Sequence, residues 1–191
     1  MARERKFTLE EVYRTVKPLL LTYGYDKFSF GHLAEDLDVS RGALYKYFKN
    51  KDELIMRYMV FELREQLAEL KTIHAYNTFE DQFDFLLDWV LKREELHVLI
   101  QVGSQVPVRA GTSVEKYKHK LDRLHLQMYK ELNPVMELGK EAGWLRKDLD
   151  HRIALGFIFQ TVAIPNHFDV QHEEWVKTIK DMIRYGLFVQ S

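Results

Sequence analysis

The residues with the clearest chemical potential form one short run, Ser40-Arg41-Gly42-Ala43-Leu44-Tyr45-Lys46-Tyr47. Ser40 can cap a helix, and the small side chains after it let the first turn of that helix approach another molecule closely. A helix N-terminus attracts anions, and Arg41 can bind a phosphate or, through two hydrogen bonds, a guanine. Tyr45, Lys46 and Tyr47 follow on the outward side. The run therefore predicts contact with nucleic acid.

The sequence gives little support for catalysis, cofactor binding or metal binding. The chain has no cysteine, which excludes disulfides, thiolate zinc sites and thiol nucleophiles. It has no phosphate-cradling glycine loop, no nucleophile elbow and no dinucleotide fingerprint. His167, Asp169 and His172 lie near one another, but we interpret them as a solvent-exposed loop. We expect no catalytic residue, no cofactor and no metal, and so a protein that is not an enzyme.

Composition indicates an ordinary globular protein. Apolar residues make up 46% and charged residues 30% of the 191 positions, and the formal net charge is -1. Residues 1–60 carry 11 basic and 9 acidic side chains, a net charge of 11 - 9 = +2, so this end would face a polyanion. The most apolar run, 153–164, is shorter than a membrane-spanning helix. We expect a cytoplasmic protein without a membrane partner.

The elements that would position residues 40–47 are short helices. Thr8 and Glu11 form a capping box that starts a helix, and Gly24 ends it. Pro18 lies inside this helix and should kink it. Helices over 29–37 and 40–48 follow, joined by a short link, which is the arrangement of a helix-turn-helix unit.

The rest of the chain also predicts helices. Asn50 caps a helix over 51–70. Later helices are expected at about 78–93, 94–103, 113–143, 148–165 and 171–188, with Pro134 kinking or dividing the long one. The fold class is therefore all-α, with about nine helices. We expect a three-helix DNA-binding domain over 1–50 and a helical domain over 51–191, with 51–70 as the connector.

Residues 28–54 resemble the DNA-binding module of the TetR family of transcriptional regulators. The resemblance rests on the pairs Leu33-Ala34 and Val39-Ser40, on Leu44-Tyr45-Lys46-Tyr47-Phe48, and on Lys51-Asp52-Glu53-Leu54. It extends over about residues 7–60. Gly31 departs from the family pattern, because that position is often an arginine that reads a base, and Pro18 is a second departure.

The resemblance implies a role for individual residues. Ser29 and Lys51 match phosphate-contacting positions, Arg41, Gly42 and Ala43 match the base-reading turn, and two tyrosines match backbone-contacting aromatics. Together with the run described above, the expected DNA-binding residues are Ser29, Ser40, Arg41, Gly42, Ala43, Tyr45, Lys46, Tyr47 and Lys51. Arg3, Arg5 and Lys6 are either a DNA-contacting arm or a solvated tail.

The family also implies a helical domain for effector binding and dimerisation after residue 60. The segment 153–164 is apolar on nearly every face, which favours its own core on one side and a second subunit on the other. The expected interface of a homodimer comprises Leu155, Ile158, Val162, Trp175, Ile179, Met182 and Ile183. A dimer presents two recognition helices and so requires a near-palindromic operator in double-stranded DNA.

The expected effector is a small, partly apolar molecule of unknown identity. Candidate pocket residues are Trp89, His97, Tyr117, His125, Met128, Trp144, Phe157 and Gln160, each of which could equally be ordinary core. The overall prediction is a repressor that the effector releases from DNA. The alternatives are an all-helical enzyme or small-molecule-binding protein that keeps the helix-turn-helix module as a scaffold, and an adaptor for protein partners.

Overall fold

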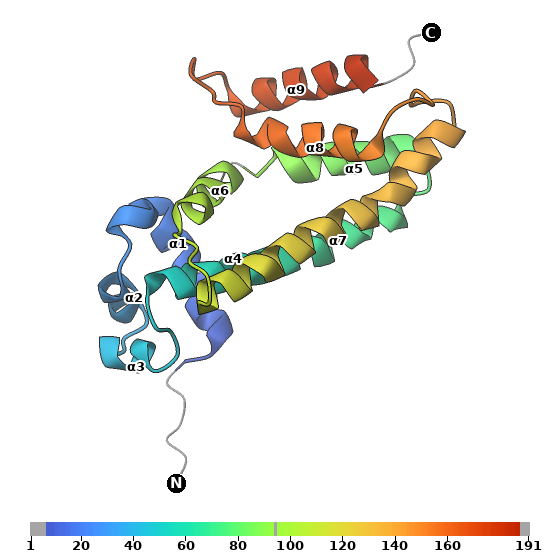
Figure 1. Cartoon of the computed structure of the whole chain (residues 1–191). Helices are drawn as coiled ribbons and strands as arrows, with labels where there is room; N and C mark the ends of the chain where they lie inside the picture. The colour runs from blue at the N-terminus through green and yellow to red at the C-terminus, as the bar shows by residue number, and fades with distance from the viewer. Residues whose placement is uncertain (1–6, 94, 188–191) are drawn as a thin grey trace. The chain divides into compact units, whose positions relative to one another are not determined.

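A computed structural model describes residues 7–93 and 95–187 of the chain (Figure 1). Arg3, Arg5 and Lys6 lie outside these residues. The described residues form nine α-helices and two short 3-10 helices, with no strand, which confirms the all-α fold. The α-helices are α1 (Leu9–Lys27), α2 (Phe30–Asp36), α3 (Arg41–Tyr45), α4 (Lys51–Leu70), α5 (Phe79–Leu91), α6 (Leu96–Gln105), α7 (Ser113–Glu141), α8 (His151–Gln160) and α9 (His172–Leu187). The 3-10 helices η1 (Lys71–Ala75) and η2 (Thr161–Ala163) follow α4 and α8.

The helix starts follow the local signals. Thr8 Oγ1 accepts from the backbone N–H of Glu11 at 3.1 Å, and Glu11 Oε2 accepts from the N–H of Thr8 at 2.6 Å, which is the predicted capping box. The hydrogen bond that the Thr8 backbone N–H donates to the Glu11 carboxylate, followed by one from the Thr8 side chain, lowers the pKa of Glu11. Asn50 Oδ1 accepts from Glu53 N at 2.9 Å and caps α4. Gly24 interrupts α1 with a φ of 63°, a value that favours glycine.

Four elements differ from the expectation. Helix α1 continues beyond Gly24 to Lys27, and α8 ends at Gln160 rather than near residue 165. The third helix ends at Tyr45 rather than near residue 48, because Tyr47 N bonds Leu44 O at 2.9 Å and the chain tightens into a turn. The long helix α7 continues through Pro134 and is not divided there. Since a proline forfeits only the bond to the carbonyl four residues earlier, 29 residues of α7 supply enough other bonds to keep it continuous.

The chain folds into two compact units. Unit 1 comprises residues 1–65 and 95–124, and unit 2 comprises 66–94 and 125–191, so α4 and α7 contribute to both. The compact units divide the chain at other positions than residue 50. The boundary expected there between a DNA-binding domain and a second helical domain therefore remains a prediction. Among the described residues, no helix is long and apolar enough to cross a membrane.

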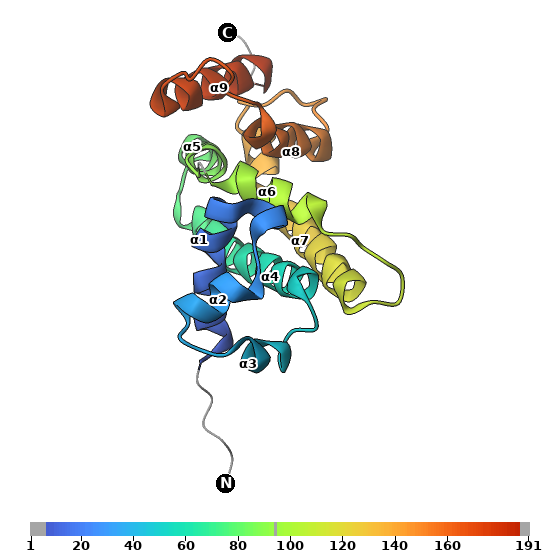
Figure 2. The same cartoon turned by 90° about the vertical axis from the view of Figure 1, so that its left-hand side faces the viewer.

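Unit 1 has one hydrophobic core. Val16 of α1, Leu33 of α2, Leu44 of α3, Ile55 of α4 and Leu99 of α6 are all buried in it. Helix α1 packs on α2 and on α6, and α2 packs on α3 (Figure 2). The short helices α2 and α3 therefore derive their stability from packing, since helices of this length are unstable alone.

Unit 2 is built around α5, α8 and α9, which lie together in both views (Figures 1 and 2). Phe83 of α5, Leu155 of α8 and Ile183 of α9 are buried in its core. Two ion pairs, Lys180 with Asp88 and Arg184 with Asp84, join α9 to α5. Unit 2 is thus a helical domain with its own core.

Candidate nucleic-acid interface

Ser29 fixes the start of α2. Its Oγ accepts hydrogen bonds from the backbone N–H groups of Gly31 at 3.2 Å and His32 at 3.5 Å. The side chain thereby satisfies two N–H groups that would lack partners in the first turn. Ser29 is half-buried, and the ring of His32 stacks on that of Tyr23 at 4.1 Å. The predicted phosphate-contacting hydroxyl thus already serves as a helix cap.

The turn between α2 and α3 is held by backbone geometry. Asp38 has a φ of 49°, a conformation that aspartate tolerates better than most residues. Val39 N then bonds Ala34 O at 2.9 Å, and Ser40 Oγ accepts from Ala43 N at 3.3 Å. These bonds turn the chain sharply and start α3 directly beside α2.

Helix α3 has one buried and one exposed side. Leu44 is fully buried and anchors the helix, whereas Ser40, Arg41, Gly42, Tyr45 and Lys46 are exposed and Ala43 is half-buried. The ring of Tyr45 leans on Phe30 of α2, with 4.7 Å between ring centroids. The predicted reading turn therefore lies on the surface, with its first residues open to another molecule.

Tyr47 is half-buried and is held from two sides. Its ring packs edge-on against Phe7 at 5.3 Å, and its backbone carbonyl accepts a hydrogen bond of 2.9 Å from Arg57 Nη1. Phe48, the next residue, is buried beneath the Arg57 guanidinium at 4.7 Å. The segment after α3 is consequently fixed to α4.

Arg57 belongs to a network that the sequence analysis missed. Its Nη1 lies 3.5 Å from the Oε1 of Glu53, one helical turn earlier, and its Cζ lies 5.6 Å from the ring centre of Tyr117. The second oxygen of Glu53 accepts from Ser113 Oγ at 2.8 Å. The i, i+4 spacing of Glu53 and Arg57 was the available sequence signal.

Lys51 has structural partners as well as its predicted role. Its Nζ donates to the carbonyls of Tyr25 at 2.8 Å and Asp26 at 3.3 Å, near the end of α1, and lies 4.3 Å from the Tyr25 ring centre. Burial, with the hydrogen bond that Tyr25 donates to Asp52 at 2.8 Å, raises the pKa of Tyr25 to about 12. Lys51 therefore joins α1 to α4.

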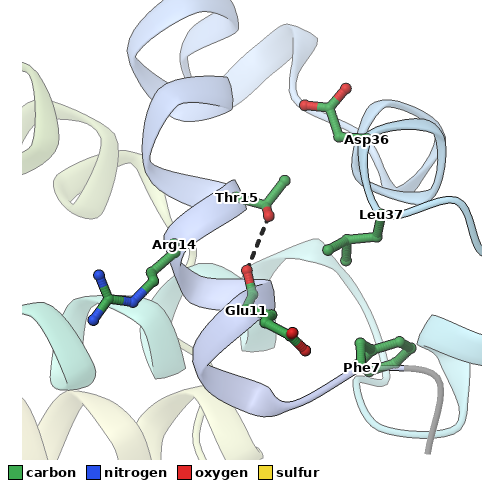
Figure 3. Close-up of a pocket in the computed structure, with 6 residues that line it drawn as sticks. All are labelled: Phe7, Glu11, Arg14, Thr15, Asp36 and Leu37. Atoms are coloured by element: carbon green, nitrogen blue, oxygen red, sulfur yellow. Dashed lines mark hydrogen bonds between the residues drawn. The ribbon is translucent and has the colours of Figure 1, made fainter.

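A hollow of about 330 Å³ lies on the DNA-binding module (Figure 3). It is lined by Phe7, by Glu11, Arg14 and Thr15 of α1, and by Asp36 and Leu37 at the end of α2. Thr15 donates to the carbonyl of Glu11, as the dashed line shows. The hollow contains none of the residues expected to bind an effector.

The candidate effector residues fall in both units. Tyr117 is half-buried and His97 is exposed in unit 1. In unit 2, Trp89 and Met128 are buried, whereas the remaining candidates are exposed: His125, Trp144, Phe157 and Gln160. The indole N–H of Trp89 is buried without a hydrogen-bond partner, although Arg93 lies over its ring. No group of three metal-binding side chains occurs in the described part of the chain.

The expected dimer residues divide by helix face. The side chains of Leu155, Ile158, Ile179 and Ile183 fill the core of unit 2, so they have no surface to offer a partner. Val162 and Trp175 are half-buried, and Met182 is 65% exposed. The sequence analysis missed Ile153, on the outer face of α8, because an all-round apolar helix does not reveal which face is covered.

Comparison with known proteins shows what the N-terminal module is similar to. Residues 18–58 match the family model described as bacterial regulatory proteins, tetR family, which includes α2, α3 and the turn between them. The chain is 28% identical over 144 residues to the HTH-type transcriptional repressor AcnR of Corynebacterium jeikeium, covering 73% of this chain and 69% of that protein. Residues 18–58 thus correspond to the helix-turn-helix DNA-binding module of TetR-type transcription regulators.

Solved structures share the fold of this chain. The regulator FadR from Bacillus subtilis, in complex with stearoyl-CoA, has a TM-score of 0.70 and 16% identity, with 94% of this chain and 99% of that chain covered. The superantigen PfiT has a TM-score of 0.75 and 15% identity, with 99% and 100% covered. At such identities the likeness concerns the fold alone, and function must be argued from the site.

Proposed function

We propose that this chain is a TetR-family repressor that binds a near-palindromic operator as a homodimer and leaves it when a small-molecule effector binds. The observation that carries the proposal is the exposed first turn of α3, with Arg41 at its start and buried Leu44 behind it. A rigid, small-residue turn with one cation at its exposed end fits the major groove of DNA. Its similarity to AcnR, a repressor, supports the direction of regulation.

The homodimer is supported by the outer faces of α8 and α9. Ile153 is 73% exposed and Phe157 is 55% exposed, one turn apart on α8, and Met182 of α9 is 65% exposed. Exposed apolar side chains that neighbour one another on a helix, as Ile153 and Phe157 do, are typical of an interaction site. A two-fold contact through these helices would give each operator half-site its own α3.

The effector is proposed to bind in unit 2. Trp89 supports this, because its buried N–H lacks an acceptor and such groups are usually satisfied. A ligand with an apolar body and an acceptor, such as a carbonyl, would supply one. The structure of the Bacillus subtilis FadR with stearoyl-CoA suggests an acyl thioester as the first compound to test.

DNA binding is tested by mobility shift on duplexes selected from a randomised library, at several salt concentrations. We expect specific binding that survives competitor DNA, with log affinity falling linearly against log salt as phosphate contacts are lost. Arg41→Ala should alter base preference, and Tyr47→Ala should weaken binding to all sequences. Lys147→Ala removes one exposed charge outside the module and is the matched control. If Arg41→Ala and Tyr47→Ala bind like the parent protein, the proposed reading surface is wrong.

The role of Lys51 needs a different experiment, because its ammonium group also donates hydrogen bonds to carbonyls near the end of α1, so a substitution affects folding as well as DNA contact. Lys51→Ala should weaken DNA binding and also lower the midpoint of urea unfolding, whereas Lys51→Arg should largely restore binding. Loss of stability with unchanged DNA affinity would limit Lys51 to a structural role.

Effector release is tested by adding stearoyl-CoA to the protein–DNA complex and measuring thermal unfolding of the free protein. We expect release of DNA together with a higher unfolding temperature. Trp89→Phe, which keeps an aromatic ring but removes the N–H, should weaken the response. A response that is identical in Trp89→Phe would remove this residue from the proposed site.

A further inference from the structure

Gly31, in the first turn of α2, lies directly beneath the end of the Arg41 side chain. A methyl group built on Gly31 would lie 2.8 Å from Nη2 and 3.3 Å from Cζ of Arg41, and 3.2 Å from Ser29 Oγ. Real β-carbons essentially never approach another heavy atom within 3.0 Å. The guanidinium of Arg41 therefore occupies space that any other residue at position 31 would need.

No ion pair accounts for this position of Arg41. Within residues 7–93 and 95–187, its guanidinium forms neither an ion pair nor a hydrogen bond, and the residue is exposed. By contrast, Arg57 is held by Glu53 and by a backbone carbonyl. The five N–H donors of the Arg41 guanidinium are consequently available to a ligand. The absence of a side chain at Gly31 is what allows the Arg41 side chain to extend across α2.

We propose that Gly31 determines operator specificity by positioning Arg41. The missing side chain lets the guanidinium reach from the start of α3 over the first turn of α2, where it reads a guanine in the major groove through two hydrogen bonds. Gly31 itself contributes no side-chain contact and acts only through Arg41. The inference rests on the proposed function, because it concerns the DNA sequence that the module prefers.

The geometry separates this role from folding. The one atom that a new methyl group would meet within 3.0 Å belongs to the flexible end of Arg41, which can swing away at little cost. Ser29 Oγ, at 3.2 Å, must give by only a few tenths of an ångström. Alanine also favours a helix more than glycine does. Gly31→Ala should therefore fold normally and still displace the arginine from its position.

The experiment is a double-mutant cycle with the wild-type protein, Gly31→Ala, Arg41→Ala and the double variant. Each is measured by mobility shift on the selected operator and on duplexes with every single-base replacement. Gly31→Ala should reduce affinity for the selected operator about tenfold and relax preference at the same guanine as Arg41→Ala. In the Arg41→Ala background, Gly31→Ala should have no further effect, because the group it displaces is gone.

Gly103→Ala, in α6, is the control for adding a methyl group to a helix of unit 1 that is not part of the proposed reading surface. A methyl group built there meets only the side chain of Met59, at an ordinary 3.6 Å or more. It should not relax preference at the guanine read by Arg41. Thermal unfolding of Gly31→Ala should match that of the wild type, and a loss of folding would overturn the inference, since Arg41 would then be unable to give way.

The two possible failures are distinct. If the wild-type chain selects no duplex, the proposed function fails. If it selects an operator but Gly31→Ala keeps the wild-type base preference, or its effect persists in Arg41→Ala, Gly31 does not act through Arg41 and the inference fails alone.

Discussion

Arg57, in the second turn of α4, donates a hydrogen bond of 2.9 Å to the backbone carbonyl of Tyr47, just after the recognition helix. The bond ties the segment proposed to contact DNA to a helix that also contributes residues to unit 2. Because the guanidinium also lies over Phe48 and beside Glu53, one side chain fixes three parts of the module. The orientation of α3 therefore depends on α4.

Arg57→Ala should destabilise the module and weaken DNA binding. The change leaves the Tyr47 carbonyl and buried Glu53 without this partner, which we expect to cost about 2–3 kcal/mol of unfolding free energy. Urea unfolding measures the loss, and mobility shift measures DNA affinity. Arg14→Ala removes an exposed i, i+4 pair with Glu10 and should leave the midpoint unchanged. Equal stability of the two variants would contradict the role given to Arg57.

Gly139→Ala should destabilise unit 2 through overpacking. A methyl group built on Gly139 of α7 would lie 2.5 Å from a ring carbon of Phe79 and 2.8 Å from Leu145 Cδ1, both in the core. We expect a cost of about 1–3 kcal/mol in urea unfolding. Gly156→Ala is the control, because its nearest contact would be Tyr129 Oη at an ordinary 3.5 Å. A Gly139→Ala protein as stable as Gly156→Ala would show that α5 and α7 are packed less tightly.

Phe157→Glu should separate the proposed dimer. The side chain is more than half exposed, so the folded subunit can hold a carboxylate there, whereas an apolar interface cannot bury it without cost. Sedimentation velocity should show a monomer, and affinity for a two-half-site operator should fall at least about tenfold. Val108→Glu changes an exposed loop residue outside α8 and α9 and should remain dimeric. A dimeric Phe157→Glu protein would place the interface elsewhere.

Asp150 should make stability depend on pH at the start of α8. Hydrogen bonds from the side chain and then the backbone N–H of Arg152 lower the pKa of Asp150. A carboxylate with a lowered pKa in the folded state adds stability above its ordinary pKa, and this stability is lost as the pH falls through the folded value.

Asp150→Asn isolates this charge, because asparagine caps helices as well as aspartate does. The variant should unfold at a slightly lower temperature than wild type at pH 7. The difference should shrink as the pH falls below about 4. A difference that stays constant over this range would exclude the carboxylate charge as its cause.

Much of the fold could be predicted because its signals are local. The predicted capping residues Thr8, Ser40 and Asn50 each bond a backbone N–H three residues later, so their effect requires no knowledge of distant parts of the chain. The same holds for Gly24, whose φ of 63° depends on its own backbone. Most helix boundaries were accordingly predicted within a few residues, and the largest difference is at α8, which was expected over 148–165 and spans His151–Gln160.

The residues of the proposed reading turn could be proposed from the sequence because they form one contiguous run. The distant side chains that hold this segment in place could not. Tyr47 and Arg57 are ten residues apart, and Ser113 is 60 residues from Glu53, so neither hydrogen bond follows from a local pattern. Leu155 and Phe157 are equally apolar in sequence, yet one is buried and the other exposed.

The sequence by itself determined that this protein is all-helical, where most of its helices begin, and which turn places a cation at the start of α3. Only the tertiary structure decided that Arg41 lies over Gly31, that Arg57 fixes Tyr47, and which face of α8 remains open. The physical reason is the distance along the chain over which each interaction acts. Capping and helix propensity act over about one helical turn, whereas side-chain packing depends on which helices meet after the whole chain has folded.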